Sequence, residues 1–379
     1  MAQRVKTDWV LFGCILALVC FGLVMVYSAS SVVAELKFGY SGYYIVRQMA
    51  WAVLGLAVMI GLMRLDYRRL NSPACAFASI GVVLFLLVVV YFVDSRAHRW
   101  LRLGPVGIQP SEFAKPALIL FLAYFVALRA KAINNRHTLL PALVAVVPLA
   151  VAVVIADLGT AAVLVITAAV VFYVAGLEKK YIWRALIIGV ICVGAAVAWK
   201  PYRMVRVFGF FDPEYKTLER FAWGEKVKTY LGQSSFNRDP GYHVRQSKIA
   251  VGSGGLIGKG LMDGKQKLFY LPEAHTDFIY AVVGEELGLL GCGTLVVLYL
   301  VILWRGLQLA RSTQDDFGRY LAVGVTSIIV VQALMNMSVV LDMAPAKGIP
   351  LPMISYGGSS LLSTLILLGM LLSVSEQSG

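Results

Sequence analysis

The stretch WVLFGCILALVCFGLVMVYSA, residues 9–29, contains no charged side chain and is long enough to cross a bilayer as one helix. A membrane-spanning helix needs about 20 consecutive, mostly apolar residues. Arg4 and Lys6 precede the stretch, as basic residues precede the hydrophobic region of a secretory signal peptide, but that region has only roughly 7–15 residues. We therefore expect an uncleaved first transmembrane helix here.

Further stretches of the same kind follow, so the sequence predicts about ten transmembrane helices. Two of the stretches are interrupted by the polar residues Glu112 and Asp157. Polar breaks at membrane depth are tolerated only where they face protein or a wet cavity, so we expect both residues inside the bundle. The predicted spans are residues 9–29, 45–63, 74–93, 111–128, 139–156, 158–176, 182–199, 284–304, 319–341 and 355–374.

The composition of the whole chain also indicates a membrane protein. Of its 379 residues, 59% are hydrophobic and 15% are charged, whereas soluble globular proteins carry about 45–50% and roughly 25%. These values exclude a water-soluble enzyme and predict an all-α polytopic membrane protein with one membrane domain over residues 1–379. The five cysteines show no CxxC spacing and the four histidines are scattered, so neither a disulfide framework nor a thiolate or zinc site is expected.

The distribution of positive charge predicts the orientation in the membrane. Short cytoplasmic loops of membrane proteins carry an excess of lysine and arginine. This excess falls on the side of the N-terminus, for example at Arg64, Arg68 and Arg69, so both termini are expected to be cytoplasmic. Residues 200–274 then form one long extracytoplasmic loop before the eighth helix.

This long loop is basic and rich in glycine, in a chain whose net charge is +13. Such a loop either suits an anionic ligand such as a lipid phosphate or rests in solvent on anionic headgroups. It does not contain a Walker nucleotide-binding loop, because Ser253 and Gly260 stand where that loop needs Gly and Ser or Thr. Residues 214–238 are charged and aromatic and suit an amphipathic helix on the membrane surface.

Asp277 is the first candidate for chemistry. It lies in the stretch LPEAHTDFIY, residues 271–280, where the long loop re-enters the membrane. A carboxylate at such a boundary, followed by apolar residues, can have a raised pKa and act as a general base. Alternatively, Thr276 or Asp277 serves as the N-cap of the following helix, a role that suits both residue types.

Three further charged residues are expected inside the membrane. Glu112 and Lys115 lie three positions apart and therefore on one face of the fourth span. They form either an internal ion pair or a polar wall of a cavity in which Lys115 is offered to a phosphate. Asp157, between the fifth and sixth spans, suits the counter-charge of a nearby arginine or lysine.

Two basic residues of the outer loops also allow two interpretations. Arg99, next to Trp100, is either an interfacial anchor or a phosphate-binding arginine. Lys347 lies in PAKGIPLPMISYGGSS, residues 345–360, where three prolines within eight residues forbid a regular helix. Packing explains the prolines and glycines of this stretch, but it does not explain Lys347.

Six separated motifs together resemble those of a known family, in the same order along the chain. They are Gly22–Ser30, Gln109–Lys115, Asp157–Thr160, Gly241–Ser247, Leu271–Gly288 and Lys347–Ser360. Through them the chain resembles the SEDS family, the shape, elongation, division and sporulation proteins, essentially from end to end. Lys347-Gly348 and Gly284–Gly288 look like the division branch, whereas His243 and Lys248–Ala250 look more like the elongation branch.

The resemblance implies a ten-helix peptidoglycan glycosyltransferase that polymerises lipid II, an undecaprenyl-pyrophosphate-linked disaccharide peptide, at the outer face of the bacterial cytoplasmic membrane. It implies a class B penicillin-binding protein transpeptidase and other membrane proteins of the division septum as partners, and no nucleic acid. The family's essential aspartate falls on Asp277, and its functional Glu and Lys of the fourth span fall on Glu112 and Lys115. The other substrate-binding candidates are Arg99, Asp157, Gln246, Lys248, His275, Lys347, Ser355 and Ser359.

The expected reaction uses Asp277 as the general base. Asp277 accepts the proton of a sugar hydroxyl, whose oxygen attacks the anomeric carbon of a second lipid-linked unit, and polyprenyl pyrophosphate leaves with inversion. Glu112 and Asp157 are expected to hold the cations that stabilise the leaving group. The candidate cations are Arg99, Lys115, Lys248 and Lys347. No Asp-x-Asp pair predicts a metal site, and a divalent cation bound to the substrate pyrophosphate is left open.

The main alternative is a lipid II flippase, in which Glu112, Lys115 and Asp157 would line a polar path for the headgroup. A transporter of this kind needs access from both sides of the membrane, often through paired broken helices in two repeats. The charged candidates of this sequence instead gather toward one face, and no internal repeat is visible. A purely scaffolding protein would leave Asp277 and Lys347 without a role.

Overall fold

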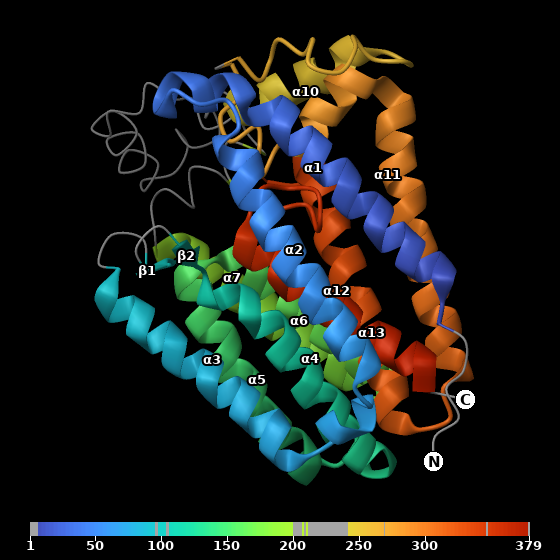
Figure 1. Ribbon diagram of the computed structural model, residues 1–379. Coiled ribbons are helices and arrows are strands. Elements are labelled where there is room, and N and C mark those ends of the chain that lie inside the picture. Colours follow the sequence, from blue (N-terminus) through green and yellow to red (C-terminus); the bar gives the residue numbers. More distant parts are fainter. Residues whose placement is uncertain are drawn as a thin grey trace, which may run out of the picture.

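The computed structural model describes residues 7–94, 98–103, 106–199, 207, 210, 242–268, 270–345 and 348–377. These residues form α-helices, together with two 3-10 turns and one small hairpin, and longer segments precede α11 and α13 (Figure 1). The first seven helices are α1 (Trp9–Phe38), α2 (Tyr43–Arg64), α3 (Pro73–Val93), α4 (Pro110–Arg129), α5 (Arg136–Ala156), α6 (Leu158–Val174) and α7 (Lys179–Trp199). The later helices are α10 (Tyr242–Gly254), α11 (Ile279–Ser312), α12 (Asp316–Val340) and α13 (Gly358–Gln377). The 3-10 turns are η1 (Tyr67–Leu70) and η2 (Ala130–Ala132), and the antiparallel hairpin pairs β1 (Leu101–Leu103) with β2 (Val106–Ile108).

The predicted all-α polytopic membrane fold is confirmed. Each of the ten predicted spans coincides with one helix, and eight helices of the described chain are long and apolar enough to cross a membrane. Helix α6 is shorter, with 17 residues, and α7 begins with Lys179 and Lys180. The start of α1 lies beside the end of α13, where the Thr7 hydroxyl donates to the Glu376 carboxylate at 2.7 Å. The first and last described residues therefore lie at the same end of the helix bundle. The prediction that both termini are cytoplasmic requires this arrangement.

The centre of the bundle is built from helices that carry small and hydroxyl side chains. Helix α2 packs along α13, and α12 packs on both α4 and α11. Gly369 of α13 lies so close to α2 that an added Cβ would be 2.9 Å from the Met59 carbonyl oxygen. Small residues allow such close approach between membrane helices, and the Thr364 hydroxyl is satisfied by the Ser360 carbonyl within its own helix.

Asp157 breaks the chain between α5 and α6, at one of the two interruptions predicted from the sequence. Its carboxylate accepts hydrogen bonds from the Gly159 amide at 2.8 Å and from the Thr160 hydroxyl at 2.9 Å. The side chain therefore caps α6 at membrane depth and satisfies backbone donors that would otherwise be unpaired.

Helix α11 begins earlier than predicted and contains a sharp break at Gly288. This residue has φ +64° and ψ −158°, a conformation that is essentially restricted to glycine. The segment after α10 replaces the lost helical bonds, because the Gly255 carbonyl accepts from the Leu289 amide at 2.9 Å. The described part of the predicted 200–274 loop thus contains the helix α10 and packs on α11. Residues 214–238 lie outside the described residues.

Two buried carboxylates of α11 hold this segment in place. Glu286 is fully buried and contacts the Lys267 ammonium at 2.6 Å and the Ser28 hydroxyl of α1. Glu285, also fully buried, contacts the Lys259 ammonium at 2.9 Å. These contacts join α1, α11 and the segment before Asp277 into one rigid unit.

Candidate active site

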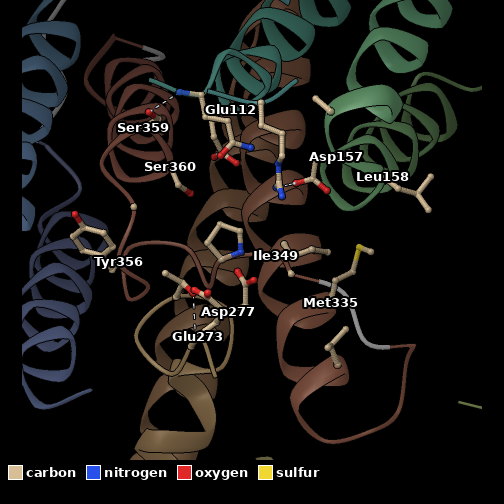
Figure 2. Close-up of a pocket in the computed structure, with 18 of the residues that line it drawn as sticks. Glu112, Asp157, Leu158, Glu273, Asp277, Met335, Ile349, Tyr356, Ser359 and Ser360 are labelled. Carbon is tan, nitrogen blue, oxygen red and sulfur yellow. Dashed lines mark hydrogen bonds and ion pairs between the residues drawn. The ribbon is translucent and has the colours of Figure 1, made fainter. Parts of the chain in front are cut away.

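A cavity of about 1580 Å³ lies between α2, α4, α12, α13, the β1–β2 hairpin and the loop before α11. Typical small-molecule pockets measure roughly 300–1,000 Å³, so this cavity can hold a large ligand. One part of the wall is apolar, with Trp51 and Leu54 of α2 and Leu334 and Met335 of α12. Figure 2 shows the polar part, where the side chains of several predicted site residues meet.

Asp277 lines the cavity and is half-buried. Its backbone carbonyl accepts a hydrogen bond from the Asn336 side-chain amide at 2.7 Å, and the same amide donates to the Ile349 carbonyl at 2.7 Å. The Asn336 side chain of α12 therefore fastens the loop before α11 to the loop before α13.

The N-cap alternative for Thr276 and Asp277 is wrong. Phe278 occupies the position before α11, and it has no capping side chain. The Thr276 hydroxyl donates instead to the carboxylate of Glu273 at 3.0 Å. Glu273 also lines the cavity next to Asp277 (Figure 2), and its positive φ of +54° is unusual for a residue with a side chain. Strained backbone of this kind gathers at functional sites.

His275 and Ser355 hold the loop that carries Asp277, and neither lines the cavity. The Ser355 hydroxyl donates to the Thr276 carbonyl at 2.5 Å, and the Tyr356 amide donates to the His275 carbonyl at 2.9 Å. The His275 ring lies 4.7 Å from the Tyr44 ring, and burial lowers the pKa of His275, so its ring stays neutral at pH 7. Both residues thus support the Asp277 loop, and their contact with the substrate stays a prediction.

Gly348 is in direct contact with the Asp277 carboxylate. A Cβ added at Gly348 would lie 2.2 Å from Asp277 Oδ2, far inside van der Waals contact. The carboxylate can occupy its place only because residue 348 has no side chain.

Replacing Gly348 by Ala is therefore expected to displace the Asp277 carboxylate while leaving the fold intact. A displacement of about 1 Å in a reacting group can lower the rate by about 10²-fold. Turnover of the variant, measured beside its thermal unfolding temperature in detergent, checks this prediction. Gly293→Ala is the matched control, since nothing lies within 4 Å of a Cβ at that position of α11. Equal turnover of Gly348→Ala and wild type would show that the contact does not position the carboxylate.

Glu112 and Lys115 form the internal ion pair that was one of the two predicted alternatives. The Lys115 ammonium lies 2.6 Å from the Glu112 carboxylate, both side chains are 3% exposed, and the ammonium also donates to the Gln332 side chain at 2.9 Å. Glu112 lines the cavity, whereas Lys115 lies behind it. The structure thus shows the ion-pair alternative, with Lys115 covered by Glu112 and Gln332, and the binding of a phosphate by Lys115 stays a prediction.

Arg99 and Asp157 both line the cavity and form an ion pair at 3.1 Å; Figure 2 labels Asp157. The Arg99 and Trp100 amides donate to the Asp94 carboxylate at 3.1 and 3.2 Å, so the chain entering the hairpin is fixed at the end of α3. Asp157 is thus the counter-charge predicted for a nearby arginine, and the pair connects the hairpin to the break between α5 and α6.

The remaining predicted residues have different placements. Ser359 lines the cavity, and its hydroxyl accepts from the Gln109 amide at 3.0 Å. Gln246 and Lys248 of α10 do not line the cavity, and the Lys248 ammonium pairs with Asp342 at 2.6 Å on the exposed surface. The structure thus places both away from the cavity that Asp277 lines, and their contact with its ligand stays a prediction. Lys347 lies outside the described residues.

Among the Asp, Glu, Lys and Arg residues that line the cavity, sequence reasoning missed Arg47, Arg102 and Glu273. Arg47 stands at the outer end of the second span, a position where arginine is also common as a membrane anchor, so its sequence context carried no distinct signal. Among the described residues, no three His, Cys, Asp or Glu side chains converge as a metal site would require. The cavity therefore offers acid–base groups, cations and a long apolar wall, which suits an amphiphilic ligand.

The chain matches known proteins over nearly its full length. Residues 8–379 match the FtsW/RodA/SpoVE family, described as cell cycle proteins. The chain is 38% identical to the probable peptidoglycan glycosyltransferase FtsW of Geobacter metallireducens, covering 98% of this chain and 95% of that protein. It is 37% identical to stage V sporulation protein E of Bacillus subtilis, covering 99% of both.

Solved structures give the same result for the fold. A chain of a peptidoglycan synthase complex, from a study of the structural coordination of polymerization and crosslinking, aligns with a TM-score of 0.70 and 30% identity, covering 98% of both chains. The rod shape determining protein RodA of Thermus thermophilus aligns with a TM-score of 0.66 and 27% identity, covering 99% of this chain and 98% of that one. Together with the helical bundle and the placement of the six sequence motifs, these matches show that the chain belongs to the FtsW/RodA/SpoVE family of cell cycle proteins.

Proposed function

We propose that the protein is a peptidoglycan glycosyltransferase that polymerises lipid II at the outer face of the cytoplasmic membrane. The observation that carries the proposal is the half-buried Asp277 at the polar end of a cavity of about 1580 Å³ with an apolar wall. Lipid II joins a polar sugar to a long isoprenoid chain, so a site for it needs both kinds of surface beside a general base.

In the proposed reaction, an Asp277 carboxylate oxygen accepts the proton of the acceptor sugar hydroxyl. The hydroxyl oxygen forms a bond to the anomeric carbon of the donor unit, the bond from that carbon to the pyrophosphate oxygen breaks, and the configuration inverts. The pyrophosphate leaves with the electron pair, and nearby cations stabilise its charge. The hydrogen bonds of Asn336 and Ser355 hold the Asp277 loop, so the base needs little reorganisation.

The packing of the helices supports entry of the substrate from the bilayer. Helix α2 packs on α1 and α13, whereas α3 packs on α4 and α5. Leu54 of α2 lines the cavity and is 48% exposed, so in the proposed path the isoprenoid chain remains in the membrane while the sugars reach Asp277.

We further propose that the protein works in the cytoplasmic membrane at the division septum, with a class B penicillin-binding protein transpeptidase and other division proteins. Several relatives carry the name FtsW, and one solved relative belongs to a complex that coordinates polymerization and crosslinking. A polymerase whose product is crosslinked in place gains by holding the crosslinking enzyme beside it.

The test is polymerisation of purified lipid II by the detergent-solubilised protein, alone and with its cognate transpeptidase. Glycan strands of increasing length are expected, with release of polyprenyl pyrophosphate. If wild-type protein with a bound partner made no strands but moved labelled lipid II across the membrane of proteoliposomes, the flippase alternative would replace the polymerase.

A further inference from the structure

The cations predicted to bind the pyrophosphate are already paired with acids wherever the structure describes them. Lys115 pairs with Glu112 at 2.6 Å, Arg99 with Asp157 at 3.1 Å and Lys248 with Asp342 at 2.6 Å. A cation that already faces a carboxylate attracts a second anion less strongly, because its charge is largely compensated, although the Arg99 guanidinium keeps N–H donors beyond the one that contacts Asp157. A site for a diphosphate needs at least one cation whose charge is not neutralised by the protein.

Arg47 of α2 is such a cation. It lines the cavity, and no carboxylate of the described chain forms an ion pair with it. Its guanidinium donates to the Tyr43 hydroxyl and lies 5.1 Å from the centre of the Tyr43 ring. Tyr43 in turn stacks on Phe38 with the ring centres 3.8 Å apart. Aromatic contacts orient a guanidinium without neutralising its charge, so Arg47 is held ready for an anion.

The orientation of α2 around its own axis is also fixed. Gln48 is buried, and its side-chain amide donates to the Ser355 carbonyl at 3.2 Å and accepts from the Gly357 amide at 3.1 Å. These two bonds join α2 to the loop that supports Asp277. Arg47, the neighbouring residue, is therefore held on the cavity side of the helix.

Arg47 stands at one end of a stripe along α2. Ala50, Trp51 and Leu54 also line the cavity, at positions three, four and seven residues after Arg47, and these positions share one face of a helix. At a rise of 1.5 Å per residue, the stripe extends about 10 Å from the cation. A cation followed by an apolar stripe matches the shape of a prenyl diphosphate, with the charge at one end and the isoprenoid chain beyond it.

Arg102 of β1 also lines the cavity, and the described residues include no acid paired with it. It is exposed, and no aromatic ring within the described chain holds its guanidinium. No apolar stripe of its own element continues from it, since β1 ends at Leu103. The geometry therefore favours Arg47 over Arg102 as the diphosphate ligand.

We infer that Arg47 binds the diphosphate of the polyprenyl-linked substrate and that the first isoprenoid units lie along Ala50, Trp51 and Leu54. This inference rests on the proposed function for the sugar transfer, but recognition of a prenyl diphosphate can be measured without any turnover. Arg47 is charged throughout the reaction and transfers no proton. It stabilises the negative charge that moves onto the pyrophosphate as the glycosidic carbon–oxygen bond breaks.

The experiment compares binding of three probes to the purified full chain in detergent: farnesyl diphosphate, farnesol and inorganic pyrophosphate. Wild type is expected to bind farnesyl diphosphate most tightly. Arg47→Gln is expected to bind farnesyl diphosphate roughly 10- to 100-fold more weakly than wild type, which corresponds to the free energy of one charge-assisted hydrogen bond. Its affinity for farnesol should be unchanged. Arg47→Lys should recover part of the lost affinity, because lysine keeps the positive charge but lacks the planar guanidinium that donates two parallel hydrogen bonds.

Arg64→Gln is the matched control, because Arg64 is exposed at the opposite end of the same helix. Its affinity for all three probes should equal that of wild type. Equal affinity of Arg47→Gln and wild type for farnesyl diphosphate would overturn the inference and leave Arg47 as an interfacial anchor. Inorganic pyrophosphate bound as tightly as farnesyl diphosphate, with the same dependence on Arg47, would overturn the placement of the isoprenoid chain.

The same variants separate this inference from the proposed function. In the lipid II assay, Arg47→Gln should polymerise at least about tenfold more slowly than wild type. Its kcat should be lower and its KM higher than those of wild type. Suppose that the wild-type protein makes no glycan but binds farnesyl diphosphate, and that this binding depends on Arg47. That result would refute the polymerase but not the diphosphate site. Normal polymerisation by Arg47→Gln would refute the site and leave the polymerase in place.

Discussion

Replacing Asp277 by Asn is expected to lower the rate of lipid II polymerisation by about 10²- to 10⁴-fold, the usual contribution of one positioned general base. Asparagine has nearly the same shape as aspartate but does not accept a proton at neutral pH. The contact that anchors this residue to α12 uses its backbone carbonyl, which the substitution keeps. The variant should therefore fold and bind substrate while losing the chemical step.

Polymerisation by purified wild type and Asp277→Asn, each with the same transpeptidase, measures this effect directly. Asp342→Asn provides the matched control, because Asp342 pairs with Lys248 on the surface and does not line the cavity. Its φ of +60° is also well suited to asparagine. The control should polymerise like wild type. An Asp277→Asn protein that elutes as a folded species and retains most of its activity would remove Asp277 from the role of base.

The membrane helices are predictable from sequence because the signal is local. Each span depends on the apolar character of its own residues, and the break at Asp157 follows from a polar side chain inside an apolar run. The long segment before Asp277 is not predictable in this way. Its fold depends on Glu285 and Glu286, which contact residues about 20 positions away in sequence and one residue of α1.

Residues of the candidate site can be predicted from the sequence only where their position costs free energy that the neighbouring residues do not offset. Glu112, Asp157 and Asp277 stand out because a carboxylate in or beside a membrane span requires a reason, and all three line the cavity. Lys248 and Arg47 are both basic residues of the outer face with no such distinction. Whether one faces solvent and the other a cavity depends on how α10 and α2 are oriented in the bundle, which no local pattern encodes.

The burial of Lys115 leads to the second large expected effect, on stability. The Glu112–Lys115 pair is 3% exposed on each side, so removing one partner leaves an uncompensated charge inside the bundle. Breaking such a pair typically costs about 3–5 kcal/mol, whereas replacing both partners by neutral residues of similar volume is often close to neutral. We therefore expect Lys115→Met to be strongly destabilised and the double variant Glu112→Gln with Lys115→Met to recover most of the loss.

Thermal unfolding of the four proteins in detergent, wild type, each single variant and the double variant, gives the interaction as a double-mutant cycle. If Lys115→Met unfolded at the wild-type temperature, the pair would carry no stability. Activity of the double variant then decides what the pair does beyond folding. Because the Glu112 carboxylate lines the cavity, a stable double variant should still polymerise poorly. Full activity in that variant would instead make the pair a purely structural element, and the Glu112 carboxylate would have no role in the reaction.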